Sequence, residues 1–201
     1  MLKIYGNRLS GNCNKVEYVA KLTKTPYEYV VMDFQKDLKT PWFLKIHPAG
    51  KVPAIDDDGF VLFESGAICT YLCEKTKSSL LPVDLKMRAL VEQWMDFSVQ
   101  HVGNAIGKVA FNRVFAPMMN LPADENSIKE GLSHLERFLP IVEAQLSKSS
   151  YFVGTELSLA DITLVATLEY AEMAKIDLSG YHNLVNWRKR IMEMPFYTKT
   201  P

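Results

Sequence analysis

A serine, an asparagine and a cysteine stand close together in the segment Ser10-Gly11-Asn12-Cys13. A strand-like run precedes this segment and a helix-like pattern follows it, so its side chains are expected at the start of a helix. A helix N-terminus has unpaired backbone N–H groups and a partial positive charge, and both stabilise an anion. The hydroxyl of Ser10 or the amide of Asn12 could therefore hold a negatively charged atom, whereas the alternative is that Ser10 simply caps the helix.

The three cysteines, Cys13, Cys69 and Cys73, could in principle do redox or metal chemistry. Ser10 and Cys13 have the spacing of a redox Cys-x-x-Cys pair, but a serine in the first position excludes dithiol exchange. Cys69 and Cys73 lie four residues apart on an expected helix, and no His-rich segment accompanies them as a metal-binding partner. We therefore expect three buried thiols, no metal site, no disulfide framework and a reducing, cytoplasmic location.

The elements that position these residues alternate between strand and helix over residues 1–76. Strands are expected at 3–5, 27–32, 52–55 and 60–63, and helices at 13–24, 41–46 and 65–75. The run Asp56-Asp57-Asp58-Gly59 predicts a hairpin turn, and Ser65 is available as the N-cap of the last helix. The resulting order βαβαββα is that of a thioredoxin-like domain.

The second half of the chain has only helical periodicity. A linker is expected over residues 77–86, where the periodicity lapses, and an all-helical domain over residues 87–201. Its helices are expected at about 87–115, 124–147, 158–174 and 184–193. Ser158 and Asp161 predict a capping box at the third of these helices, which is a folding element and not a binding site. The fold class is thus an α+β domain followed by an all-α domain.

The composition excludes several classes of function. The 201 residues contain 23 Lys and Arg against 23 Asp and Glu, giving a net charge of zero, and no basic tract is present. Nucleic-acid binding therefore has no evident electrostatic source. No apolar run approaches the roughly 20 residues that span a bilayer, so we expect no membrane segment. The N-terminus has no apolar core of the kind that a signal peptide needs.

Four segments taken together resemble the cytosolic glutathione transferase family over nearly the whole chain. They are Tyr5–Val16, the His-Pro-x-Gly-Lys-Val-Pro motif of His47–Pro53, Phe63–Ile68, and Ser158–Asp161. Each segment alone is a modest match, but their order and spacing make the resemblance specific. Within the family, the chain is similar to bacterial-type members with a serine/asparagine active-site motif. The resemblance implies a cytoplasmic detoxification enzyme that forms a homodimer.

The resemblance also implies a glutathione site in the first domain. The matching residues are Ser10, Lys39, Lys51, Val52, Pro53, Glu64 and Ser65. Val52-Pro53 resembles the family's cis-proline junction, at which the Val52 backbone pairs with the peptide ligand. Lys51 would meet the glycine carboxylate of glutathione, as would Lys39 by a looser match. Glu64 would pair with the γ-glutamyl ammonium and Ser65 with the γ-glutamyl carboxylate.

The resemblance assigns catalysis to Ser10 or Asn12. A thiol with a pKa near about 8.5–9 is only a few per cent ionised at neutral pH. Lowering that pKa by about two units requires roughly 2.7 kcal/mol, which one charge-assisted hydrogen bond and the helix dipole can supply. A Ser10-held thiolate implies conjugation to small hydrophobic electrophiles. An Asn12-held thiolate implies glutathione-dependent reduction of disulfides or peroxides, and a non-catalytic glutathione transferase-like binding protein is the third alternative.

The expected helix at 87–115 carries aromatic residues and one histidine. Trp94, Phe97 and Phe111 follow its helical spacing, as residues of a core or of an acceptor pocket would. We expect His101 to be a surface or structural histidine and not a catalytic base. A hydrophobic pocket of this kind would discriminate weakly between similar ligands.

Overall fold

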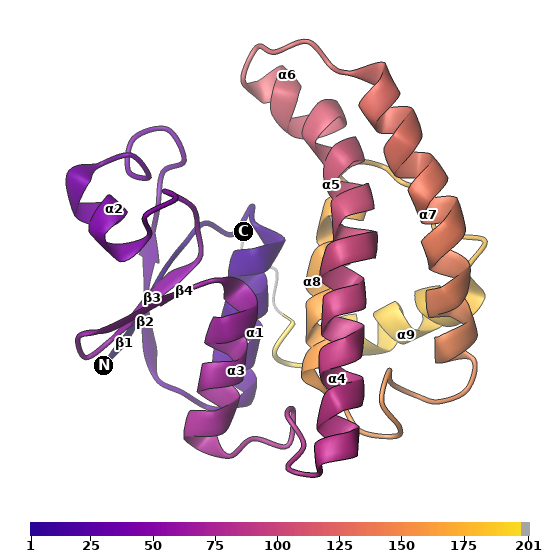
Figure 1. Ribbon diagram of the computed structural model, residues 1–201, viewed down its shortest axis with the longest axis horizontal. Helices are drawn as coiled ribbons and strands as arrows, with labels where there is room; N and C mark the ends of the chain where they lie inside the picture. The colour runs from indigo at the N-terminus through magenta and orange to yellow at the C-terminus, as the bar shows by residue number, and fades with distance from the viewer. Residues whose placement is uncertain (198–201) are drawn as a thin grey trace. The chain divides into compact units, whose positions relative to one another are not determined.

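The computed structural model describes residues 1–197, which divide into two compact units (Figure 1). The first unit contains Met1–Val83 and residues 195–197, and the second contains Asp84–Met194. The boundary between them falls inside the linker predicted at 77–86. The helical domain was predicted to reach residue 201, and its residues 198–201 lie outside the described part of the chain.

The first unit is built on a mixed four-stranded sheet. Its strands are β1 (Leu2–Gly6), β2 (Tyr27–Val31), β3 (Ala54–Asp57) and β4 (Phe60–Phe63). Their order in the sheet is β2-β1-β3-β4, with β1 parallel to β2 and antiparallel to β3. With the helices between them, the strands confirm the predicted βαβαββα order of a thioredoxin-like domain.

Helices cover both faces of this sheet. They are α1 (Gly11–Leu22), α2 (Pro41–Ile46) and α3 (Ser65–Thr76). Helices α1 and α3 pack side by side on one face (Figure 1), and the three cysteines are buried in these two helices, as predicted. On the other face Tyr5 of β1 packs against Phe43 of α2, with ring centroids 6.2 Å apart. The alternation of side chains along β1 thus supplies apolar groups to both layers.

The β3–β4 hairpin begins two residues later than predicted. The sequence predicts a strand at 52–55, whereas β3 spans Ala54–Asp57. Pro53 has no N–H to donate to a neighbouring strand, so pairing starts after it. The turn is then the two residues Asp58 and Gly59, whose φ angles of 52° and 95° fit a type I′ hairpin.

The second unit contains helical segments only, apart from one isolated bridge between Tyr151 and Gly154. They are α4 (Leu85–Phe97), η1 (Ser98–Gly103), α5 (Asn104–Ala110), η2 (Phe111–Phe115), α6 (Ala116–Met118), α7 (Glu125–Leu146), α8 (Leu159–Met173) and α9 (His182–Met192). The all-helical prediction is confirmed for the described residues.

The single α-helix predicted at 87–115 is wrong in one respect, because two π-helical stretches, η1 and η2, interrupt it. Near each stretch an asparagine side chain bonds to the carbonyl four residues earlier. Asn104 Nδ2 donates to Gln100 O at 2.7 Å, and Asn112 Nδ2 donates to Lys108 O at 2.8 Å. These amides compete with backbone N–H groups for the carbonyls, which favours the wider turn.

Helix α8 is buried on all sides over its first half, from Leu159 to Ala166. The predicted capping box of Ser158 and Asp161 is present at its start. The carboxylate of Asp161, which is fully buried, accepts four hydrogen bonds. They come from Phe152 N at 3.0 Å, Ser158 N at 3.0 Å, Ser158 Oγ at 2.8 Å and Trp187 Nε1 at 2.9 Å. One side chain thus joins the start of α8 to α9 and to the preceding loop.

After the second unit, the chain returns to the first. Phe196 and Tyr197 are both buried and pack on Tyr18 of α1. The ring centroids lie 5.5 Å apart for Tyr18 and Phe196, and 5.1 Å apart for Tyr18 and Tyr197. The first unit is therefore completed by residues from both ends of the described chain.

Candidate functional site

Ser10 stands at the N-cap position of α1, directly after the loop that leaves β1. Its backbone is extended, with φ −97° and ψ 112°, and its N–H donates to Asn7 O at 2.9 Å. The Ser10 side chain accepts no capping hydrogen bond from the helix. Ser10 therefore has the position of an N-cap without the capping hydrogen bond, and its side chain interacts with the Cys13 thiol instead.

The start of α1 meets the start of α3. Ser65 Oγ and Asn12 Oδ1 lie 3.3 Å apart, which joins residues 53 positions apart in the sequence. Asn12 is in the first turn of α1, and Ser65 is the first residue of α3. Two helix N-termini thus lie at one place in the first unit, and each presents unpaired N–H groups that favour an anion.

Glu64 connects β4 to α3 and has an unusual backbone. It occupies the N-cap position with φ 71° and ψ 110°, a conformation that costs a residue other than glycine about 1–3 kcal/mol. The prediction that Ser65 is the N-cap is therefore wrong. Only one residue separates Phe63 at the end of β4 from Ser65 at the start of α3, so Glu64 must turn the chain. Its side chain is exposed.

The Val52-Pro53 peptide bond is cis, as the resemblance implied. Lys51, next to it, has an exposed side chain. Lys39 lies against the same segment, because its Nζ donates to Ala49 O at 3.4 Å. The two lysines therefore belong to one surface region of the first unit.

Gly50 allows this region to pack closely. Its φ is +58°, and a Cβ at this position would lie 2.5 Å from Leu38 O and 3.0 Å from Lys39 Nζ. Any other residue would have both an unfavourable backbone and a clash with the Leu38 carbonyl oxygen. The glycine of the His-Pro-x-Gly motif thus fixes the distance between the two lysine-bearing segments.

His47, the first residue of the His-Pro-x-Gly-Lys-Val-Pro motif, links the lysine region to Glu64. Its ring is buried and stacks on Phe63 with centroids 4.6 Å apart. Burial lowers the pKa of His47; the charge of Glu64 raises it and that of Lys51 lowers it. Its imidazole is therefore close to groups at both ends of the predicted site, and the lowered pKa favours the neutral ring.

Lys15 is a second residue whose place near the site was not predicted. It lies on α1 with 2% of its surface exposed, and burial lowers its pKa while the charge of Glu64 partly offsets that effect. In the sequence, the only sign of this buried lysine was its place inside the otherwise apolar pattern Cys13, Val16 and Val19.

The structure groups the predicted residues around two contacts. One joins Asn12 to Ser65, and the other joins Lys39 to the 47–53 segment. His47 lies between them.

The thiols of the first unit are unsuited to catalysis. Burial raises the pKa of Cys13 to about 11, and the pKa values of Cys69 and Cys73 to about 12. Reactive cysteines instead have lowered pKa values and partial exposure.

Within residues 1–197, no group of three or more His, Cys, Asp or Glu side chains could hold a metal ion. No helix in the same range is both long and apolar enough to cross a membrane.

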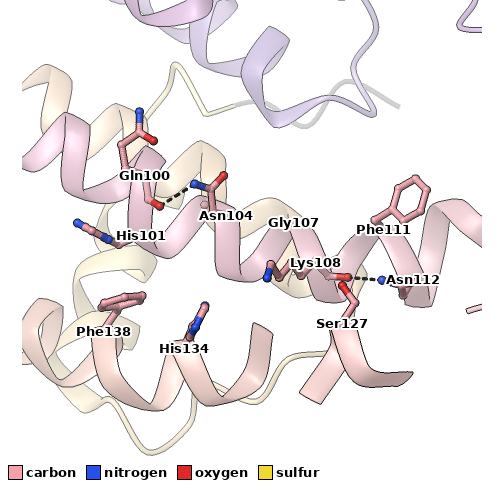
Figure 2. A pocket seen from close by; sticks show the side chains of 11 residues that line it. Gln100, His101, Asn104, Gly107, Lys108, Phe111, Asn112, Ser127, His134 and Phe138 are labelled. Atoms are coloured by element: carbon pink, nitrogen blue, oxygen red, sulfur yellow. Dashed lines mark hydrogen bonds between the residues drawn. The ribbon is translucent and has the colours of Figure 1, made fainter. Parts of the chain in front are cut away.

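The second unit has a cavity of its own, with a volume of about 640 Å³ (Figure 2). Its lining comes from η1, α5, η2 and α7, and consists of Gln100, His101, Gly103, Asn104, Gly107, Lys108, Phe111, Asn112, Ser127, His134 and Phe138. The Phe138 ring lies between the two histidines, 4.9 Å from His101 and 6.0 Å from His134. None of the predicted glutathione-binding residues lines this cavity.

His101 is exposed and packs on aromatic rings, which confirms the expectation of a surface histidine.

Comparison with known proteins gives two family matches. Residues 1–74 match the family model for the glutathione S-transferase N-terminal domain, and residues 106–195 match that for the C-terminal domain. Over 200 residues the chain is 35% identical to the probable glutathione S-transferase GSTF2 of Oryza sativa subsp. japonica, covering 96% of this chain and 93% of that protein. Over 169 residues it is 39% identical to glutathione S-transferase F10 of Arabidopsis thaliana, covering 82% and 77%.

Comparison with solved structures also finds glutathione transferases. The structure of glutathione transferase F2 from Populus trichocarpa has a TM-score of 0.90 and 30% identity, covering 98% of this chain and 95% of that one. Glutathione S-transferase-I bound with lactoylglutathione has a TM-score of 0.88 and 31% identity, covering 98% and 96%. The curated relatives named above are plant proteins, so the narrower resemblance to bacterial-type members is not borne out. That resemblance depended on Ser10-Gly11-Asn12, a segment too short to decide a subgroup.

Proposed function

The chain belongs to the glutathione S-transferase family and has its fold, a thioredoxin-like domain followed by a helical one, and on that premise we propose how it works. It is a transferase that conjugates glutathione. In our proposal the first unit binds glutathione as a thiolate and transfers it to small hydrophobic electrophiles. The observation that carries the proposal is the meeting of two helix N-termini at Ser65 and at Asn12, two residues after Ser10 at the N-cap position of α1.

Glutathione carries two carboxylates, one ammonium and one thiol, and the candidate residues complement each of these groups. Lys51 and Lys39 would bind the glycine carboxylate, and the Val52 backbone at the cis peptide would pair with the extended tripeptide. Glu64 would bind the γ-glutamyl ammonium, and Ser65 with the first N–H groups of α3 its carboxylate. Held at both ends, the tripeptide would present its sulfur to the start of α1.

Ser10 would stabilise the sulfur as a thiolate. Its hydroxyl would donate to the sulfur, and the partial positive charge at the start of α1 would add to that stabilisation. The thiol proton leaves to solvent, the thiolate attacks the electrophilic carbon, a C–S bond forms and the leaving group departs. Positioning of the two reactants supplies much of the rate enhancement. Asn12, which contacts Ser65, would join the two helix starts.

An ultraviolet titration of bound glutathione tests this assignment. The absorbance of the thiolate is followed against pH for the unmodified protein, Ser10→Ala and Asn12→Ala. We expect a thiol pKa below the free value in the unmodified protein, a return towards the free value of about 9 in Ser10→Ala, and a smaller change in Asn12→Ala.

Two other outcomes would favour the alternative functions. A lowered thiol pKa that survives Ser10→Ala but is lost in Asn12→Ala, together with disulfide or peroxide reduction, would favour the oxidoreductase. Absence of glutathione binding at millimolar concentration would leave a non-catalytic binding protein.

In our proposal the cellular location, the role and the oligomeric state are those expected of the family. We place the protein in the cytoplasm as a detoxification enzyme and a homodimer, with glutathione as co-substrate and no metal. Light scattering coupled to size exclusion measures the assembly directly. A mass near twice the 22.8 kDa of one chain is expected, and a mass near 22.8 kDa at micromolar concentration would contradict the dimer.

A further inference from the structure

The four residues that connect β1 to α1 carry Ser10, and several hydrogen bonds fix them to the surrounding unit. Asn7 Nδ2 donates to Met32 O at 2.9 Å, and Asn7 Oδ1 accepts from Leu9 N at 3.0 Å. Asn14 Nδ2, in the helix, donates to Arg8 O at 3.0 Å. The loop is thus attached to Met32, the residue after β2, on one side and to α1 on the other.

The side chain of Arg8 makes the strongest of these attachments. Its guanidinium binds the Glu17 carboxylate through two hydrogen bonds, Nε to Oε2 at 3.1 Å and Nη2 to Oε1 at 2.9 Å. The same guanidinium lies over the Tyr29 ring, with Cζ 4.2 Å from the centroid. Such paired hydrogen bonds fix both the position and the plane of the guanidinium.

Glu17 is held in turn by neighbours on α1 and β2. Only 5% of its side chain is exposed, and Tyr27 Oη donates to its Oε1 at 2.9 Å. Lys21, one turn further along α1, lies 3.8 Å from the same oxygen. Burial alone would raise the pKa of Glu17, but the hydrogen bonds from Arg8 and Tyr27 and the charge of Lys21 lower it. The ionised carboxylate is therefore held by Arg8, Tyr27 and Lys21 together.

This arrangement is better suited to positioning than to stability. A buried ion pair often contributes little net stability, because the desolvation of both charges offsets their attraction. Helix α1 is already anchored by apolar residues such as Val16 and Val19, which are fully buried. What the ion pair adds is a fixed location for the loop residue two positions before Ser10.

We propose that Arg8 is a positioning residue: its paired hydrogen bonds to Glu17 and its stacking on Tyr29 hold the β1–α1 loop so that the Ser10 hydroxyl is directed at the glutathione sulfur. The inference rests on the proposed function of Ser10. Arg8 touches neither substrate nor sulfur in this proposal. A lysine in its place would keep the positive charge but lose the planar, two-pronged contact.

The test is Arg8→Lys, measured in three ways in the full-length protein. We expect the pKa of the bound glutathione thiol to rise towards the free value and kcat for a standard aryl halide to fall about tenfold, since small misplacements of reacting groups have effects of this size or larger. The KM for glutathione should change less than twofold, because the peptide-binding residues are untouched. Glu17→Gln, which keeps an acceptor for Arg8 but removes the charge, should move the same quantities in the same direction.

The matched control is Arg88→Lys. Arg88 and Glu92 form an arginine–glutamate pair on α4, with 3.2 Å between Nε and Oε1, and Glu92 is half exposed. This variant should leave the thiol pKa and kcat unchanged. Circular dichroism and Tm identify variants that fold.

The outcomes separate the two proposals. Arg8→Lys and Glu17→Gln variants that fold, have a lower Tm, and yet keep the thiol pKa and kcat of the unmodified protein would overturn the positioning role alone. Misfolding of both variants would also overturn it, because the pair would then be a requirement for folding. If Ser10→Ala leaves the thiol pKa unchanged in the same titration, the proposed function fails first and the inference with it.

Discussion

Asp161 gives the sharpest test of how the second unit is held together. Its buried carboxylate accepts bonds from Phe152 N, Ser158 N, Ser158 Oγ and Trp187 Nε1, so one substitution removes four hydrogen bonds. In Asp161→Ala the Ser158 hydroxyl can rotate towards another acceptor, but three N–H donors are left without a partner. Each buried donor without a partner costs about 1–3 kcal/mol.

Part of that loss is offset, because the substitution also removes a buried charge. Burial raises the pKa of Asp161 despite the hydrogen bonds that lower it, so the ionised carboxylate itself is costly. We therefore expect Asp161→Ala to reduce the free energy of unfolding by about 3–5 kcal/mol. In Asp161→Asn the remaining oxygen can still accept hydrogen bonds from Phe152 N and Trp187 Nε1. Only Ser158 N loses its acceptor, because the new amide N–H₂ faces it with another donor. The expected cost of this variant is therefore about 1–3 kcal/mol.

Urea unfolding measures these differences from the midpoint shift, provided the slope m is unchanged. Asp84→Ala is the matched control, because Asp84 is an exposed acidic N-cap that accepts one bond, from Met87 N at 2.9 Å. Its expected cost is about 1 kcal/mol. If Asp161→Ala costs no more than Asp84→Ala, buried acceptors do not hold this unit together. If Asp161→Asn costs as much as Asp161→Ala, the hydrogen bonds from Phe152 N and Trp187 Nε1 do not account for the loss.

Three further results are expected. The three cysteines should resist Ellman's reagent in the native protein and react completely in denaturant, since burial raises their pKa values to about 11–12; rapid reaction of one native thiol would contradict that burial. Gly50→Ala should lower the unfolding free energy by about 1–3 kcal/mol, because of its φ of +58° and the nearby Leu38 carbonyl, and a neutral urea midpoint would refute the clash. Because the pKa of Glu17 is lowered in the folded state, its contribution to stability should be complete above the unfolded pKa of about 4.3 and be lost as the pH falls through the folded value. Unfolding at pH 6, 4 and 3 should therefore show a smaller loss of stability on acidification in Glu17→Gln than in the unmodified protein; equal losses would exclude this role.

Local sequence patterns determine most of the element bounds. The predicted bounds of α2 and β4 match those observed, since Pro41 marks the start of a helix and Asp58-Gly59 marks a tight turn. The π-helical stretches were not predictable, because they differ from the flanking α-helix only in which carbonyl each backbone N–H reaches. They depend on which carbonyls the side chains of Asn104 and Asn112 reach, and periodicity does not carry that information.

The candidate site was predictable as a set of motifs but not as an arrangement. Nothing in the spacing of Asn12 and Ser65 indicates that they touch, because their contact depends on how α1 and α3 pack. The N-cap role of Glu64 likewise depends on β4 ending at Phe63, one residue before the helix. His47 and Lys15 were missed because their importance is their burial next to charged neighbours, which is a tertiary property.

The return of residues 195–197 to the first unit has a topological consequence. The chain crosses between the units twice, after Val83 and after Met194, so the helical unit is an insertion into the thioredoxin-like one. A protease that cuts after Met194 leaves Met1–Val83 joined to the helical unit, whereas a cut after Val83 separates them and leaves residues 195–197 attached to the helical unit. A fragment ending at Val83 would lack Phe196 and Tyr197, and Tyr18 would lose the two rings that pack on it. Dissecting this protein into autonomous pieces would therefore call for a circular permutant that places residues 195–197 before Met1, not for simple truncation.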